Sequence, residues 1–276
     1  MSQKVTKPYE LLTIQDHFMF GKVTQDPVNA ETILDALLPR SVTVNSAESE
    51  RRIQLLKEKK YIQLDLHAIG SDGTNYDAEL QHKSSNIEKQ AELPKRSRYY
   101  QSLIDGQIID TGTNYLDMPD TYIIFICNFD PFNQNYYKYT FRQECSTKES
   151  KISLNDGTTR IFFNLTADFN DAPEETRNML EYLAHGHVSD EATKRIADAV
   201  DLAREKEEWR KEYMLASLYY DDLRREAIAE EQKNSIKNMI QILKEVEKPQ
   251  IYIIEKLMDM YNLSKETAEQ YVNEYY

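Results

Sequence analysis

The chain has 276 residues and a formal net charge of −13, with 40% hydrophobic residues and 19 tyrosines. This length and this aromatic content predict a folded protein with a sizeable core and exclude a disordered chain. The acidic charge excludes nucleic-acid binding that depends on overall charge, but a local basic patch with metal ions could still hold a phosphate backbone.

Nothing in the sequence indicates export or a membrane. No run of about 18 apolar residues occurs, and no basic N-terminal stretch precedes an apolar one. Cys127 and Cys145 have neither zinc-like nor redox spacing, which is typical of ordinary thiols in a reducing compartment. We therefore expect a globular protein of the cytoplasm.

The first long helix is predicted over residues 28–38. Its apolar residues recur at helical spacing, and Pro39 ends the run. This helix would cover one face of a sheet. Glu31 lies on it, either as a solvated carboxylate or as a residue that projects into an active site.

A β-hairpin is predicted next, over residues 61–69 and 74–81, because Gly70-Ser71-Asp72-Gly73 separates two alternating runs. In the first run, one face carries Ile62, Leu64, Leu66 and Ala68, and the other carries Gln63, Asp65 and His67. In the second run, the apolar face carries Tyr76, Ala78 and Leu80, and the polar face carries Asp77, Glu79 and Gln81.

The register of this hairpin brings two carboxylates together. A three-residue loop would pair Gly70 with Thr74 and place Asp65 opposite Glu79. Directly opposed residues have Cβ atoms roughly 4.5–5.5 Å apart, and like charges there are destabilising unless something neutralises them. A divalent cation would do so, and carboxylate and amide oxygens, including that of Gln81, suit Mg²⁺ or Mn²⁺ better than zinc. The alternative is a solvated polar face.

Residues 83–98 form a basic segment on an acidic chain, with five basic and two acidic residues, a net charge of +3. A second basic group, at residues 57–60, precedes the hairpin. Ser85 to Glu88 has the form of a capping box, which predicts a helix start near Asn86, and Pro94 would open a second helix that ends near Asp105. The basic segment is either a phosphate-binding patch or a solvated helix face.

Residues 121–129 (TYIIFICNF) are a nearly continuous apolar run, which predicts a strand buried on both faces. A helix would connect this strand to the second hairpin strand by a right-handed parallel crossover. Strand-like runs follow at residues 136–141 and 159–165. Residues 1–168 therefore predict an α/β domain.

Residues 169–276 predict an all-helical extension. Its apolar stripe is typical of core or partner-helix packing and comprises Trp209, Met214, Leu215, Leu218, Tyr219 and Leu223. Two final helices are predicted over residues 250–261 and 264–275, and Ser264 would be the N-cap of the second one. They form either a packing or oligomerisation module or a DNA-reading helix-turn-helix, for which Lys265 is the only basic residue in the second helix.

Five motifs follow one another in the first 132 residues: Asp16-x-Phe18-x-Phe20, Leu64-Asp65-Leu66, Tyr76-Asp77-Ala78-Glu79-Leu80-Gln81, Arg98-Tyr99-Tyr100-Gln101, and YIIFICNFDPF from Tyr122. In this order they resemble the Rpn family of recombination-promoting nucleases and transposases, within the PD-(D/E)XK nuclease superfamily. The resemblance covers residues 13–165. It implies a restriction-endonuclease-like mixed central sheet flanked by helices, with a helical C-terminal extension.

The resemblance also implies a Mg²⁺-dependent DNA endonuclease, with Mn²⁺ as a substitute, in which Asp65 and Glu79 hold the metal. Where the superfamily has Glu-x-Lys, this chain has Gln81 as the third catalytic residue. Lysine supplies a fixed positive charge, whereas glutamine acts only through hydrogen bonds or as a metal ligand. Lys83 could replace the missing charge if the strand continues.

Further residues take roles by the same resemblance. Lys83, Arg98, Tyr99 and Gln101 are candidates for contact with DNA phosphates, and Tyr99 could equally be a core residue. Asp16, in the first of the five motifs, is a candidate for an outer residue that supports the catalytic carboxylates, and so is Glu31, from its place on the predicted helix rather than from the resemblance.

The expected function is hydrolysis of DNA phosphodiester bonds with little sequence specificity, linked to recombination or transposition. The alternative is a catalytically weak or inactive nuclease-fold protein that binds DNA or regulates a partner through its helical tail. A homo-oligomer formed through the C-terminal helices is compatible with either.

Overall fold

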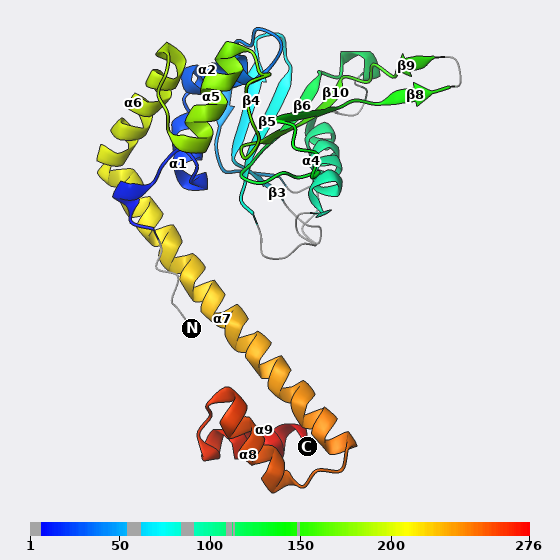
Figure 1. The fold of residues 1–276 in the computed structure, drawn as a ribbon, viewed down its shortest axis with the longest axis vertical. Coiled ribbons are helices and arrows are strands. Elements are labelled where there is room, and N and C mark those ends of the chain that lie inside the picture. The colour runs from blue at the N-terminus through cyan, green and yellow to red at the C-terminus, as the bar shows by residue number, and fades with distance from the viewer. Residues whose placement is uncertain (1–6, 54–61, 84–90, 109–111, 113, 148–149) are drawn as a thin grey trace. The chain divides into compact units, whose positions relative to one another are not determined.

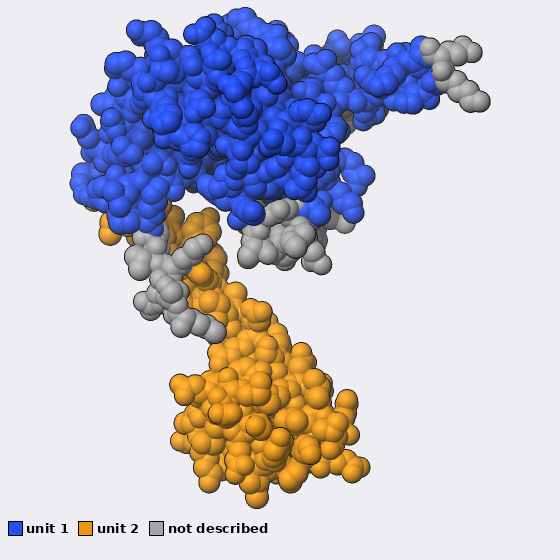
Figure 2. Space-filling model, viewed as in Figure 1, with its two compact units in different colours: residues 1–210 blue, residues 211–276 orange. Residues whose placement is uncertain are grey.

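The computed structural model describes residues 7–53, 62–83, 91–108, 112, 114–147 and 150–276. The chain forms two compact units, residues 1–210 and 211–276 (Figure 2). The first unit extends beyond the boundary expected at residue 168 because α5 (Glu174–His185) and α6 (Glu191–Glu205) pack against α2 (Pro27–Leu37), and α6 also packs against α1 (His17–Thr24). An independent domain over residues 1–168 stays a prediction.

A mixed sheet of six strands, counted in the described residues, forms the centre of the first unit (Figure 1). Across the sheet the strands are β1 (Val44–Glu48), β4 (Leu66–Gly70), β5 (Asn75–Gln81), β6 (Thr121–Cys127), β10 (Thr158–Asn164) and β7 (Lys138–Phe141). The pairs β5–β6 and β6–β10 are parallel, and the others are antiparallel. The predicted α/β class and the predicted parallel pairing of β5 with β6 are both confirmed.

Helix α4 (Leu93–Ile108) lies between β5 and β6 in the chain and covers one face of the sheet, while α1 and α2 cover the other (Figure 1). Strand β6 is buried along its whole length, as its apolar run predicts. The ring of Phe125 lies between Tyr100 of α4 and Phe162 of β10, with centroids 5.9 and 5.3 Å away. Glu79 pairs with Phe125 in the sheet, so its side chain faces α4.

The first hairpin strand differs from its prediction, because it is interrupted at Asp65. Residues Ile62–Leu64 form β3, which pairs with β2 (Arg51–Ile53) in a separate two-stranded sheet. Leu64 packs in the core beneath α4, whereas Leu66 pairs with Ala78 on the opposite face. The prediction that Leu64 and Leu66 share one face is therefore wrong.

Several elements escaped prediction because they are only three to five residues long and show no clear apolar periodicity. They are the 3₁₀ helices Tyr9–Leu11 and Tyr115–Asp117, the edge strand β1, and the exposed hairpin of β8 (Glu144–Ser146) and β9 (Lys151–Ser153). The capping box predicted to begin a helix near Asn86, and the basic group at residues 57–60, lie outside the described residues.

The second unit is a small helical module made by the end of α7 (Glu207–Glu245) with α8 (Gln250–Tyr261) and α9 (Lys265–Tyr275). Its core consists of Ile236, Ile240, Ile253, Leu257, Ala268 and Val272. Ser264 caps α9 by accepting a hydrogen bond from the Thr267 backbone N–H, as predicted. This core supports the interpretation of the last two helices as a packing module. None of the described helices has the length and apolar character that crossing a bilayer requires.

Candidate active site

The centre of the candidate site is the pair Asp65 and Glu79. The β4–β5 ladder pairs Leu66 with Ala78 and His67 with Asp77, which is the register that the hairpin loop predicts. The backbone ladder stops at Asp65, and beyond it the two segments are joined by hydrogen bonds between backbone N–H groups and carboxylate side chains. The Asp65 backbone N–H donates to Glu79 Oε1 at 2.9 Å, and the Leu80 backbone N–H donates to Asp65 Oδ2 at 3.0 Å. Each carboxylate is thus held by the opposite strand.

The carboxylate face of β5 is buried, so the alternative of a solvated face is wrong for Asp77 and Glu79. Their exposed fractions are 0% and 2%. Burial raises the pKa of Glu79 well above its ordinary value, and the charges of Asp65 and Asp77 add to the shift. Burial likewise raises the pKa of Asp77, and neither of its carboxylate oxygens has a hydrogen-bond partner among the described residues.

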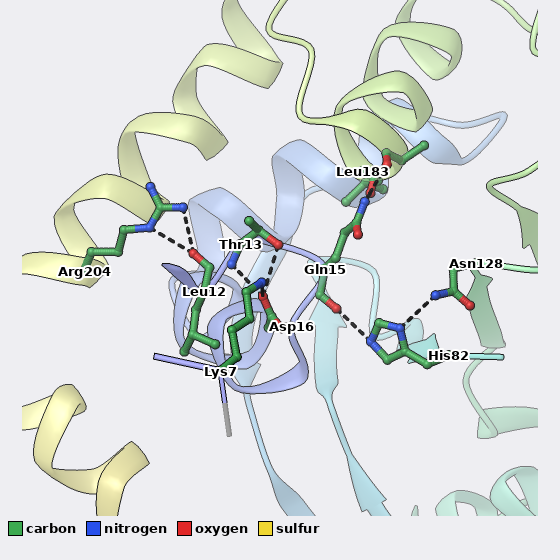
Figure 3. A network of polar contacts seen from close by, with 10 residues as sticks. Lys7, Leu12, Thr13, Gln15, Asp16, His82, Asn128, Leu183 and Arg204 are labelled. Carbon is green, nitrogen blue, oxygen red and sulfur yellow. Dashed lines mark hydrogen bonds and ion pairs between the residues drawn. The ribbon is translucent and has the colours of Figure 1, made fainter. Parts of the chain in front are cut away.

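Two histidines border the pair. His17, at the start of α1, places Nδ1 2.8 Å from Asp65 Oδ2. Burial lowers the pKa of His17, but the hydrogen bond and charge of Asp65 outweigh burial, and the net shift is upward. His82 lies edge-on to His17, with ring centroids 5.1 Å apart. It donates from Nε2 to the Gln15 carbonyl and accepts at Nδ1 from the Asn128 amide, which makes it neutral (Figure 3).

Gln81 is bonded to an arginine rather than to a carboxylate. Arg96 Nη1, on α4, donates to Gln81 Oε1 at 2.9 Å, and Gln81 Nε2 donates to the Leu80 carbonyl at 2.7 Å. Because a guanidinium group only donates, the amide oxygen of Gln81 must face Arg96. In this arrangement the Gln81 amide oxygen already accepts a hydrogen bond from Arg96.

The predicted DNA-contacting residues divide by exposure. Lys83 and Arg98 are exposed, and the Lys83 backbone N–H donates to Asn128 Oδ1. Tyr99 is half-buried and packs against the core beneath α4. Gln101 is buried and donates to Asp105 Oδ1 at 2.8 Å. Phosphate contact by these residues stays a prediction, and Lys83 and Arg98 are the two that solvent reaches freely.

The hydrogen bonds and ion pairs of Asp16 and Glu31 are made with residues other than Asp65 and Glu79. Asp16 accepts from the backbone and hydroxyl of Thr13 and pairs with Lys7, which fixes the turn before α1 (Figure 3). It therefore supports the position of His17, its neighbour in the chain. Glu31 accepts from the Val44 backbone N–H at 2.8 Å and so ties α2 to β1.

Comparison with known proteins adds the decisive observation. A family model described as PD-(D/E)XK nuclease family transposase matches residues 18–248. The chain belongs to this family. No curated protein and no solved structure matched it. The match spans the whole sheet of the first unit and all of α7, and it agrees with the resemblance carried by the five motifs. Membership supports a nuclease-like or transposase-like function.

Nucleases of the PD-(D/E)XK family typically use divalent metal ions, and the donor set here fits such an ion. Among the described residues, no three His, Cys, Asp or Glu side chains gather into a closed metal site. Mg²⁺ does not need one, because it keeps several waters and is usually held by one or two carboxylates together with substrate phosphates. Asp65 and Glu79, held side by side by backbone amides, are that kind of donor set.

Sequence reasoning missed three residues of the candidate site. Asp77 was visible as a neighbour of Glu79 on the polar face, but nothing indicated that it would be fully buried. Arg96 appeared only as one charge in the basic segment. His17 gave no signal, because its contact with Asp65 joins residues 48 positions apart in the chain.

Proposed function

We propose that this chain is a DNA endonuclease that depends on Mg²⁺, with Mn²⁺ as a substitute, and that it cleaves phosphodiester bonds with little sequence specificity in recombination or transposition. The observation that carries the proposal is the direct opposition of Asp65 and Glu79, each held by a backbone N–H of the other strand. A buried acidic group opposite a second, partly buried one is costly for folding, and a binding surface has no use for such a pair.

Asp65 and Glu79 would hold the metal ion. When bound, the ion lowers the pKa of a coordinated water and neutralises charge on the scissile phosphate. Glu79 must first lose the proton that its raised pKa retains, and Asp65 must exchange its contact with His17. Gln81 would orient the attacking water or a metal ligand.

The exposed cations of the basic segment would hold the DNA backbone. Lys83 lies just after β5, and Arg98 lies on α4. Contacts of this kind read phosphates rather than bases. No base-reading element is evident in the described residues, which is the basis for proposing weak sequence preference. The free thiols of Cys127 and Cys145 suit a reducing compartment, and we place the activity in the cytoplasm.

A second candidate function is DNA binding or regulation without turnover. Two observations favour it: position 81 lacks the lysine charge, and the Gln81 oxygen is already bonded to Arg96. In that case the helical tail would carry the activity, and the carboxylate pair would be inert.

We also propose that the chain forms a homo-oligomer through its C-terminal helices. The middle of α7 carries large apolar side chains that are 43–68% exposed: Met214, Leu215, Leu218, Tyr219, Tyr220, Leu223 and Ile228. A helix segment with this many exposed apolar residues is typical of an association surface.

Cleavage of supercoiled plasmid with Mg²⁺ or Mn²⁺ separates the two functions. We expect nicking by the wild type and loss of nicking in Asp65→Asn and Glu79→Gln, which keep the shape of each side chain. Glu144→Gln, at an exposed position on β8, is the matched control and should cleave normally. DNA binding by the wild type without any cleavage would favour the second candidate.

A further inference from the structure

A cation lies beside the one position where this chain departs from the Glu-x-Lys pattern. Gln81 and Glu79 are on the same face of β5, which faces α4. Arg96 Nη1 reaches across from α4 and bonds the tip of the Gln81 side chain at 2.9 Å. The charge that a lysine at position 81 would carry is therefore present at the end of Gln81, supplied by another element.

Four contacts fix the Arg96 guanidinium group. Besides the Gln81 bond, Nη2 donates to the Tyr100 hydroxyl at 2.9 Å. The group also lies 5.5 Å from the ring centroid of Tyr100 and 5.7 Å from that of Phe125. Phe125 is the sheet partner of Glu79. A planar fork that donates in two directions and stacks on aromatic rings is a task for arginine and not for lysine.

The surroundings keep this cation charged. Burial lowers the pKa of Arg96, but Tyr100 and the negative charges of Glu79 and Asp65 raise it, with a net upward shift. Because Gln81 lies two residues from Glu79 on the same face of β5, the bond from Arg96 to Gln81 also brings the guanidinium group close to the carboxylate pair.

We propose that Arg96 is a positioning residue of the phosphodiester-hydrolysing site, and that through Gln81 it supplies the fixed positive charge for which related sites use lysine. The proposal rests on the proposed function. Arg96 acts by orienting the Gln81 amide and by stabilising the negative charge that develops on the phosphate during attack by water. The competing explanation is that Arg96 merely anchors α4 to the sheet.

The first test is Arg96→Met, which keeps the length and apolar stem of the side chain. We expect single-turnover cleavage to slow by about 100-fold, the effect of removing one preorganised donor from a site of this kind. Arg195→Met, at an exposed position on α6, is the control for loss of one positive charge and should cleave like the wild type. Cleavage by Arg96→Met at the wild-type rate would overturn the proposal.

Binding of Mn²⁺ gives a readout that an anchoring role would not produce. Removing a cation from the vicinity of Asp65 and Glu79 relieves repulsion, so Arg96→Met should bind Mn²⁺ at least as tightly as the wild type in calorimetry. Undiminished Mn²⁺ affinity and slower cleavage would then occur together. Weaker Mn²⁺ binding alongside slower cleavage would mean that α4 has shifted, and this result contradicts the proposal.

Rescue supplies the decisive comparison. In the double variant Gln81→Lys with Arg96→Met, a lysine returns the charge to strand β5 while the bonds of Arg96 to Tyr100 stay absent. We expect cleavage within about 10-fold of the wild type. A double variant as slow as Arg96→Met, with an unchanged melting temperature, would refute the proposal.

The failure of the proposed function is distinguishable from the failure of this inference. If the wild type does not cleave, or if Asp65→Asn cleaves as fast as the wild type, the proposed function fails and the role of Arg96 fails with it. If Asp65→Asn is inactive but Arg96→Met is fully active, the function stands and the inference alone is wrong.

Discussion

Asp65 stops a strand at the point where the candidate site needs a carboxylate. Aspartate is disfavoured in strands, and here its Oδ2 captures the Leu80 N–H that would otherwise bond a backbone carbonyl. Glu79 makes the reciprocal bond to the Asp65 N–H. Main-chain donors thus hold the acidic pair even without a cation, and the raised pKa of Glu79 keeps that group protonated, so the two residues need not carry like charges.

The raised pKa of Glu79 makes metal binding depend on pH. Glu79 binds a metal ion only after losing its proton, and His17, whose pKa is also raised, must release Asp65. We therefore expect Mn²⁺ affinity to rise as the pH increases, with protons released on binding. Calorimetry in two buffers of different ionisation enthalpy measures this release. An affinity that does not change with pH would contradict the assignment of Glu79.

Asp77 should reduce stability as pH rises. Its folded pKa is raised above the ordinary value of 3.8, so its favourable contribution is complete below that value and is lost as pH increases through the folded pKa. Asp77→Asn should therefore stabilise the metal-free protein by about 1–3 kcal/mol near neutral pH, because asparagine has neither a charge to bury nor a proton to bind on folding. Urea unfolding at about pH 5 and about pH 8 tests the trend. A larger stabilisation by Asp77→Asn at the lower pH than at the higher one would contradict this prediction.

At the scale of elements, the sequence predicted those helices and strands whose positions depend on the residues within them. Strands β5 and β6 and helices α2, α8 and α9 follow from periodicity and from stop signals such as Pro39. The interruption at Asp65 did not, because it results from bonds between two strands. The contacts of His17 and Arg96 depend on which helix covers which face, and no spacing within the sequence specifies that choice.

The core of the second unit offers a test at the same scale. Leu257 is fully buried between α7 and α9, whereas Met260 on the same helix is 63% exposed. Leu257→Ala should destabilise the module by about 2–5 kcal/mol, and Met260→Ala by less than about 0.5 kcal/mol. Hydrogen exchange of the α8 and α9 amides reports the difference. Equal protection in the two variants would contradict the packing described for this module.

At the scale of the whole molecule, the predicted homo-oligomer depends on the exposed apolar residues of α7. Two of them, Leu215 and Leu218, lie one turn apart and are 68% and 62% exposed. Light scattering after gel filtration should give a mass above the 32.4 kDa of one chain. Leu215→Glu with Leu218→Glu should shift the mass to the monomer, since burying a charge at an apolar contact is costly. A wild type that runs as a monomer would refute this prediction.

The distribution of charge along the chain is compatible with a nucleic-acid substrate despite the acidic total. The net charge of −13 is spread over both units, while residues 83–98 are locally basic. Within about 10 Å the local charge governs the field at physiological salt, so DNA could dock at this segment despite the overall repulsion. Cleavage should consequently weaken steeply as salt increases.

The most direct test of the central claim is the nicking rate of supercoiled plasmid by Asp65→Asn, Glu79→Gln and the double variant. If the two carboxylates act as one unit, each single variant should lose at least about 1000-fold in rate, and the double variant should be no slower than the slower single one. Nicking that survives in both single variants would contradict the account.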